Sequence, residues 1–187
     1  MVKDRKNVST RIWRCNVLHD DHSYRMFLNK RYAQASIAFQ NAGRNREAKI
    51  CDAYLLREKA RLISTTARAA RTQAFVNAAN AFVSCAVNSP LNQDNERLAY
   101  YGTAGECYSE ARDLKKAGDN YRMAEQYNTA ARTYREGRHF DEIVEVIIQH
   151  GDALENDLRE RLTMVARIYC FKVYLDGFLF SKISNPL

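Results

Sequence analysis

One eight-residue pattern occurs four times in this chain of 187 residues. Each copy has an aromatic residue, two small residues three and four positions later, and a second aromatic residue at position seven. These offsets fall on one face of an α-helix. The small pair lets a second helix approach closely, and the aromatic rings fill the space beside that contact. We therefore expect these residues to pack between helices in the core. The copies are Tyr32-Ala35-Ser36-Phe39, Phe75-Ala78-Ala79-Phe82, Tyr101-Ala104-Gly105-Tyr108 and Tyr127-Ala130-Ala131-Tyr134.

In three copies a small or aliphatic residue follows nine positions after the second aromatic: Ala48, Ala117 and Ile143. This spacing predicts a short turn and a second helix that packs back on the first, as in a tetratricopeptide-like hairpin. The last three copies lie 26 residues apart, and the first precedes the second by 43, whereas a regular tetratricopeptide unit has about 34 residues. The sequence thus predicts an all-α fold, a tetratricopeptide-like α-solenoid of irregular helical hairpins.

Periodicity and helix-ending residues divide the chain further. Gly118, Gly137 and Gly151 each precede an aspartate by at most four residues, so each glycine is expected to end a helix and each aspartate to cap the next. Residues 88–95 are rich in Asn and Asp and predict a loop. We expect a basic lead at 1–19, one helical repeat domain at 20–180 and a tail at 181–187. The expected helices span 20–42, 45–63, 96–117, 120–136, 140–150 and 153–175, and a further helix is expected to be capped within 64–66 and to run to 87.

Composition restricts the environment of the chain. No run of about 18 apolar residues occurs, and the N-terminus has no apolar segment of the secretory type. The five cysteines have no C-x-x-C spacing, which indicates reduced thiols in an intracellular protein, cytoplasmic or nuclear. Residues 165–180 carry few charges, so we expect the chain to be a fragment or this end to dock on another surface; a strand pair is the less favoured alternative.

Positive charge is concentrated in the first half of the chain. Residues 1–91 have 16 Lys and Arg against 6 Asp and Glu, and residues 92–187 have 13 against 16. One continuous helix would align Arg57, Arg61, Arg68 and Arg71, although a break at 64–66 would split them. These residues could bind phosphates or acidic side chains, or could only keep an Ala-rich helix pair soluble. The candidate basic binding face, called the basic face below, comprises Arg44, Arg46, Lys49, Arg57, Arg61, Arg68 and Arg71.

No residue combination predicts catalysis. His139 and His150 lie at expected helix ends without an evident partner, and the neighbouring Asp141 and Glu142 diverge on a helix. Acidic residues at 155–160 are interpreted as a solvated face, and residues 19–22 (HDDH) as a helix cap rather than a metal cluster. We expect no catalytic, cofactor-binding or metal site.

An ordered series of short matches covers about residues 25–180. The chain resembles a segment of the large fungal proteins related to TPR and ankyrin repeat-containing protein 1, many of which carry a superfamily 1 (UvrD-like) helicase module upstream. The resemblance implies an α-solenoid beside a nucleotide-driven motor. This chain has no G-x-x-x-x-G-K-[ST] phosphate loop, so ATP binding cannot be transferred to it. The matching stretches are 53–61 (AYLLREKAR), 74–82 (AFVNAANAF), 100–101 (YY), 104–108 (AGECY), 130–137 (AARTYREG), 140–146 (FDEIVEV) and 165–169 (VARIY).

These observations favour a non-catalytic helical-repeat interaction scaffold, a fragment of a larger helicase-associated protein. Its expected partner is a protein or peptide, or the neighbouring domains of a longer chain, and no membrane is expected. The alternative is a nucleic-acid-contacting accessory segment of a superfamily 1 helicase that uses the basic N-terminal half.

Overall fold

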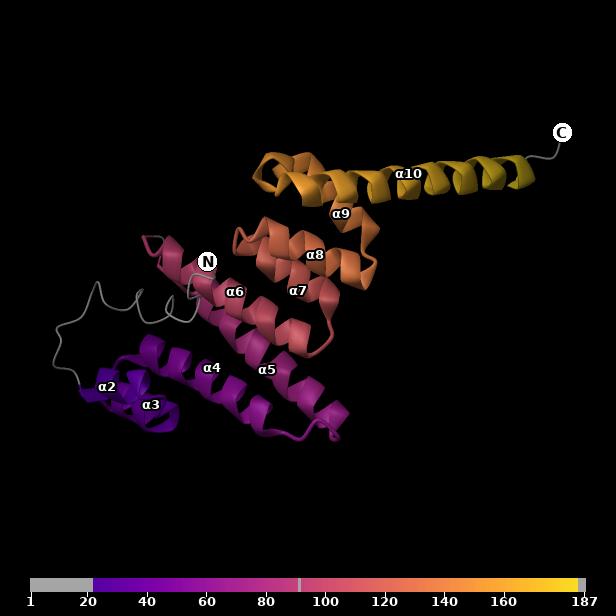
Figure 1. Cartoon of the computed structure of the whole chain (residues 1–187). Helices are drawn as coiled ribbons and strands as arrows, with labels where there is room; N and C mark the ends of the chain where they lie inside the picture. The colour runs from indigo at the N-terminus through magenta and orange to yellow at the C-terminus, as the bar shows by residue number, and fades with distance from the viewer. Residues whose placement is uncertain (1–21, 91, 185–187) are drawn as a thin grey trace. The chain divides into compact units, whose positions relative to one another are not determined.

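The computed structural model describes residues 22–90 and 92–184, with side chains described up to Tyr174. The expected basic lead, the aspartates at 20 and 21 and the end of the tail at 185–187 lie outside the described residues. Every regular element within the described ranges is helical (Figure 1), which confirms the all-α class. The elements are α2 (His22–Leu28), α3 (Tyr32–Asn41), α4 (Asn45–Leu62), α5 (Arg68–Val87), α6 (Asp94–Glu110), α7 (Leu114–Met123), α8 (Tyr127–Gly137), α9 (Phe140–His150), the 3-10 turn η3 (Gly151–Ala153) and α10 (Asn156–Ser184).

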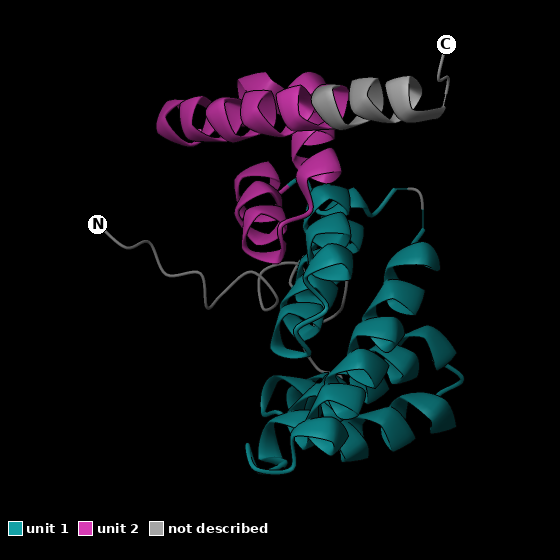
Figure 2. Cartoon of the chain, turned by 90° about the vertical axis from the view of Figure 1, so that its right-hand side faces the viewer, with its two compact units in different colours: residues 1–125 teal, residues 126–187 magenta. Residues whose placement is uncertain are grey.

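The chain divides into two compact units, residues 1–125 and residues 126–187, which Figure 2 colours separately. In the first unit each described helix packs against the next along the chain, from α2 through α7. In the second unit α9 packs against both α8 and α10. Helices that are consecutive in sequence are therefore also neighbours in space within each unit.

The four copies of the eight-residue pattern lie in α3, α5, α6 and α8, and they supply most of the core. All of their residues are buried except Tyr101 and Tyr127, which are half-buried. In α6 the neighbouring Tyr100 is buried instead, at 2% exposure. This helix packs against both α5 and α7, so its buried face is wider than the pattern alone predicts. The three residues that follow the pattern are also buried: Ala48, Ala117 and Ile143.

Three of these helices end in the same backbone turn. The residue four positions after the second aromatic has a positive φ: 70° at Gly43, 63° at Arg112 and 58° at Arg138. The next amide donates to the carbonyl of that aromatic over 2.8, 3.0 and 2.9 Å, at Phe39, Tyr108 and Tyr134 respectively. This is the hydrogen bond of a Schellman motif, which satisfies a carbonyl that the helix end leaves without a partner.

Several expected helix boundaries are wrong. The helix expected at 20–42 is interrupted at Lys30, with a φ of 60°, and the helix expected at 96–117 ends at Glu110. Gly118 does not end a helix; it is buried inside α7, which stops before Glu125 with a φ of 57°. The cause is that lysine, arginine and glutamate occupy left-handed positions expected to hold glycine. Packing of the helices offsets the cost of about 1–2 kcal/mol at each such residue.

The capping aspartates are also different from those expected. Asp113 caps α7, because its side chain accepts a hydrogen bond from the Lys116 amide at 3.2 Å. Asp119 lies within α7, and Asp152 lies in η3. Only the bounds of α9 coincide with the expected 140–150. A helix start is thus fixed by the preceding turn more than by the nearest aspartate.

The last helix is longer than expected. α10 continues to Ser184 instead of ending at 175, so the expected tail begins as helix. Large apolar side chains on its described part are about two-thirds exposed, which agrees with the weak polar face seen in the sequence. They are Met164, Ile168, Phe171 and Tyr174.

Gly105 sets the distance between α6 and α7. A Cβ atom added there would lie 2.8 Å from the Cδ1 and Cε1 atoms of the Tyr121 ring, closer than packed atoms can approach. Tyr121 is itself buried, at 8% exposure, and belongs to α7. The absence of a side chain at residue 105 therefore allows the aromatic ring to lie directly on the α6 backbone.

We expect Gly105→Ala to lower the free energy of unfolding of the first unit by about 1–3 kcal/mol, because the added methyl group must displace the ring. Urea denaturation followed by circular dichroism measures the change. In a Tyr121→Ala background the same substitution should change stability by no more than about 1 kcal/mol, and helix propensity favours alanine there. An equal loss in both backgrounds would show that the ring does not set the spacing.

Candidate functional site

The basic face does not form along a single helix. α4 ends at Leu62 and α5 begins at Arg68, so the first two arginines of the stripe lie on α4 and the last two on α5. The intervening turn is closed by hydrogen bonds to Ser64: its hydroxyl accepts from the Thr66 amide at 3.3 Å and its carbonyl from the Ala67 amide at 3.1 Å. The break that the sequence allowed at 64–66 is present, and it splits the stripe.

Much of the basic face is neutralised by acidic residues of the same unit. Arg44 pairs with Glu47 at 3.0 Å, and Arg61 pairs with Glu58 at 2.8 Å. Arg46 pairs with Glu96 of α6. Lys49 is exposed. These pairs reduce the positive potential that the sequence composition alone indicates, because a polyanion must compete with carboxylates already in place.

Arg57 belongs to the interior more than to the surface. Its side chain is 15% exposed, and its guanidinium lies over the ring of Tyr54, 5.0 Å from the centroid, and 5.7 Å from the centroid of Phe82. Burial raises the pKa of the Tyr54 hydroxyl to about 12, although the Arg57 charge lowers it. This cation–π contact indicates a packing role for Arg57.

Arg71 joins three helices at one end of the first unit. Its Nη1 donates to the Ile63 carbonyl at the end of α4, at 3.1 Å, and its Nη2 donates to Glu110 of α6, at 3.2 Å. The guanidinium also lies 4.9 Å from the ring centroid of Phe75 in its own helix. Its position is thus fixed from several directions.

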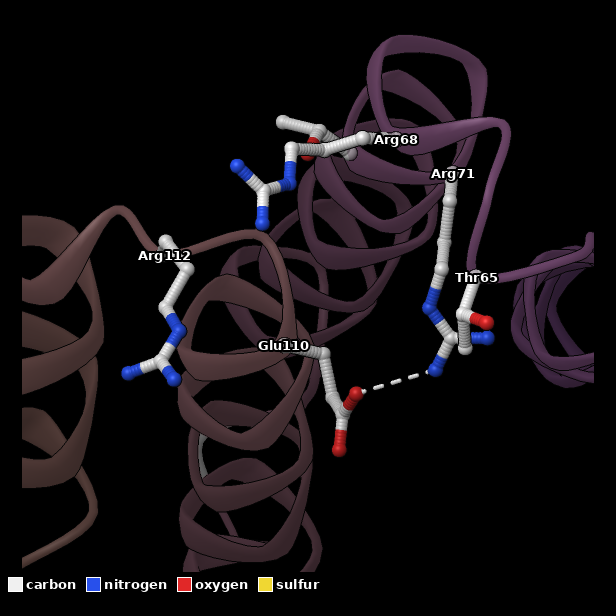
Figure 3. A pocket seen from close by; sticks show the side chains of 6 residues that line it. Thr65, Arg68, Arg71, Glu110 and Arg112 are labelled. Carbon is white, nitrogen blue, oxygen red and sulfur yellow. Dashed lines mark hydrogen bonds and ion pairs between the residues drawn. The ribbon is translucent and has the colours of Figure 1, made fainter.

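A pocket of about 410 Å³ opens beside Arg71. Figure 3 shows Arg68 on α5, Arg112 on the turn after α6, and Glu110 joined to Arg71. Three arginines and one glutamate therefore line a single concave site, and of the three arginines Arg71 pairs with the glutamate. We call this site the arginine pocket; its lining residues are Thr65, Arg68, Arg71, Thr72, Glu110 and Arg112.

Sequence reasoning found Arg68 and Arg71 but missed Arg112, Glu110 and the two threonines. Arg112 lies four residues after Tyr108, the place that Gly43 takes after Phe39. If the alignment of the pattern copies had included the turns that follow them, it would have placed Arg112 in a turn between two helices. Packing of α6 against α5 then brings Arg112 beside residues of α5 that lie about 40 positions away in sequence.

The arginine pocket can bind anions but offers little other chemistry. Guanidinium groups stay charged and donate paired hydrogen bonds to carboxylate or phosphate oxygens. The three thiols in the described part of this unit are not available as nucleophiles: burial raises the pKa of Cys51 and Cys107 to about 12 and that of Cys85 to about 11. Such thiols remain protonated near neutral pH.

The residues weighed for catalysis in the second unit make structural contacts. Asp141 accepts a hydrogen bond from the Tyr169 hydroxyl at 3.0 Å. The His150 ring stacks on Tyr127 with centroids 4.0 Å apart, and Glu155 pairs with Arg132. In the parts of the chain that the structure describes, no three His, Cys, Asp or Glu side chains gather in a way that could hold a metal ion.

The sequence matches no protein-family model and no curated protein, and the chain matches no solved structure. Within residues 22–90 and 92–184, no helix has the length and apolar character needed to cross a bilayer.

We expect Arg71→Ala to destabilise the first unit by about 1–2 kcal/mol, because it removes two charged hydrogen bonds and a cation–π contact. Arg68→Ala is the matched control: this exposed side chain makes no contact of that kind, so its loss should change stability by less than about 0.5 kcal/mol. Urea denaturation of both variants makes the comparison. Equal losses of stability in the two variants would show that the contacts of Arg71 do not hold its side chain in place in the pocket.

Stability should fall as pH rises above 9. The folded-state pKa of Cys51 and Cys107 is about 12, against an ordinary value of 9.0. Between these values the unfolded chain loses thiol protons that the folded chain keeps, so the unfolded state binds fewer protons and is favoured. Each thiol ionised only in the unfolded chain contributes about 1.4 kcal/mol per pH unit.

Urea denaturation at half-unit steps from pH 8 to pH 10 measures this effect before most tyrosines ionise. A variant with Cys51→Ala and Cys107→Ala should lose less stability over that interval than the parent chain. Parallel pH curves for the two proteins would rule out the buried thiols as the cause.

Proposed function

We propose that this chain is a non-catalytic interaction module, a tetratricopeptide-like array of helical hairpins that binds an acidic segment of a protein partner. The observation that carries the proposal is the arginine pocket, which is lined by Arg68 and Arg71 of α5, by Arg112 of the turn after α6 and by one carboxylate, that of Glu110. Anionic side chains are the ligands that such a site accepts.

The core favours a scaffold over an enzyme. Aromatic and small residues of the repeated pattern are used between helices, and the same backbone turn recurs after α3, α6 and α8. Repetition of one supersecondary unit is the plan of solenoid proteins, whose role is to present surface. As a further part of the proposal, the chain is a segment of a larger helicase-associated protein.

The alternative function, contact with nucleic acid, rests on the excess of 16 Lys and Arg over 6 Asp and Glu in residues 1–91. Several of those arginines are already paired with carboxylates of the first unit, among them Arg44, Arg46 and Arg61. Backbone binding to a nucleic acid needs a series of available cations along a track. The pairing therefore favours the acidic protein segment.

A binding experiment on the full chain separates the two functions. The probes are a fluorescein-labelled peptide pool, with three central glutamates between randomised flanks, and a labelled 20-nucleotide single strand. Arg68→Glu reverses a charge in the pocket, whereas Arg25→Glu makes the same change at an exposed position on α2. Fluorescence anisotropy at 150 mM salt gives each affinity.

We expect Arg68→Glu to weaken peptide binding about tenfold or more, the equivalent of one lost charged hydrogen-bonding group. Arg25→Glu should change it less than about twofold, because an exposed charge at a distance is screened. Equal losses in both variants would mean diffuse attraction and no site. If only the oligonucleotide bound, with the same dependence on Arg68, the nucleic-acid alternative would replace the proposal.

A further inference from the structure

An apolar stripe runs along the exposed side of α10. Met164, Ile168 and Phe171 follow one another by four and then three residues, so the helix places them on one face. All three side chains are about two-thirds exposed. Alternating steps of four and three are the spacing with which one helix packs along another in a coiled coil. We call these three residues the α10 seam.

The other side of α10 already packs within the second unit. Leu158 and Leu162 are buried, and the Tyr169 hydroxyl donates to Asp141 of α9 at 3.0 Å. Two residues turn an α-helix through about 200°, so Phe171 lies on the opposite side from Tyr169. Packing on α9 therefore leaves the seam exposed.

Beyond Cys170 the described part of α10 is exposed on every side. The four residues 171–174 are all exposed, and four residues complete more than one helical turn. Phe171, Val173 and Tyr174 among them are each at least half exposed. An apolar helical turn in water is unfavourable in proportion to its exposed area. Covering it with another surface would therefore be a gain.

The charge beside the seam is positive. Arg167 and Lys172 lie on its two edges, and both are exposed. Neither side chain makes an ion pair or hydrogen bond with another residue that the structure describes. From residue 164 to the end of α10 at 184 the sequence has three Lys or Arg and one Asp. A surface that complements these edges carries carboxylates.

Charge and width distinguish among the surfaces that could cover the seam. In a parallel pair of α10 helices from two copies of the chain, Arg167 would face Lys172 of the other copy, and like charges repel. A lipid surface favours a broad apolar face, whereas the seam spans only about 60° of the helix at about 100° per residue. A helix that has its own apolar seam and acidic edges matches both the spacing and the charge.

We propose that the α10 seam binds an amphipathic helix of another protein, with apolar residues at the same spacing and acidic residues on both edges. In this arrangement the seam packs between the apolar residues of the partner helix, and Arg167 and Lys172 pair with its carboxylates. The seam belongs to the second unit and the arginine pocket to the first. The proposal therefore goes beyond the function proposed above and does not depend on that pocket.

The experiment measures how the full chain binds two fluorescein-labelled helical peptides, by anisotropy at 150 mM salt. Both peptides are four heptads long with Leu at the two apolar positions. One has Glu at the flanking positions and the other Lys, and these like charges oppose self-association of each peptide. We expect the Glu peptide to bind about tenfold or more tightly than the Lys peptide, because attractive pairs at Arg167 and Lys172 replace repulsive ones.

Variants test the seam and its edges separately. Ile168→Gln should weaken binding of the Glu peptide about tenfold or more, because a buried apolar contact is lost. It should not lower the melting temperature, since Ile168 is exposed and Gln favours a helix at least as much as Ile. Ile148→Gln is the matched control: Ile148 is 77% exposed on α9 of the same unit, and its change should alter affinity less than about twofold. Arg167→Glu combined with Lys172→Glu should reverse the preference, so that the Lys peptide binds more tightly.

Several outcomes would overturn the proposal. They include no binding of the Glu peptide, or equal losses in Ile168→Gln and Ile148→Gln. Binding lost in Arg68→Glu but kept in Ile168→Gln would place the peptide in the arginine pocket. A dimer in sedimentation equilibrium that Ile168→Gln dissociates, without peptide binding, would assign the seam to a second copy. Binding to phosphatidylserine vesicles that Ile168→Gln abolishes, again without peptide binding, would assign it to a lipid surface.

Discussion

Close contact between consecutive helices at small residues is the constraint on which the first unit depends. At Gly105 the α6 backbone and the Tyr121 ring are so close that no Cβ atom fits between them. The aromatic residues that flank the small pairs fill the remaining space, and residues such as Phe39, Phe75 and Phe82 are fully or almost fully buried. Because dense packing of this kind transmits any added volume to its neighbours, the spacing of the helices also fixes where their ends meet. The arginine pocket lies at those ends.

The sequence predicted the interior of the fold better than its boundaries. Periodicity placed the repeated aromatic and small residues on helices, since burial follows one face of a helix directly. It failed at Lys30, Arg112 and Glu125, which adopt the left-handed conformation expected of glycine. The preference for glycine at a helix end is a local rule, and it does not include the packing energy that holds other residues in the left-handed conformation. The preference of such a turn for glycine is about 1–2 kcal/mol, small enough for several helix contacts to outweigh.

The candidate site was only partly predictable for a related reason. The spacing of the basic residues predicts that Arg68 and Arg71 belong to a stripe along one continuous helix. The turn at 64–66 divides this stripe between α4 and α5. The same charges that looked available in the sequence are used inside the unit: Arg57 packs on aromatic rings, and Arg46 pairs with a glutamate 50 positions away. A count of Lys, Arg, Asp and Glu gives the net charge of a segment. The electrostatic potential at its surface depends on which carboxylates the fold brings beside each cation.

The left-handed residue at the end of each hairpin's first helix is exposed, whether it is Gly43, Arg112 or Arg138. Its side chain is not needed for the core, and its backbone hydrogen bonds are the same for any residue. Such a turn can therefore change its surface chemistry by a single substitution while the helices on both sides keep their packing. Each of these three turns carries one exchangeable position, and new binding preferences could be engineered there one turn at a time.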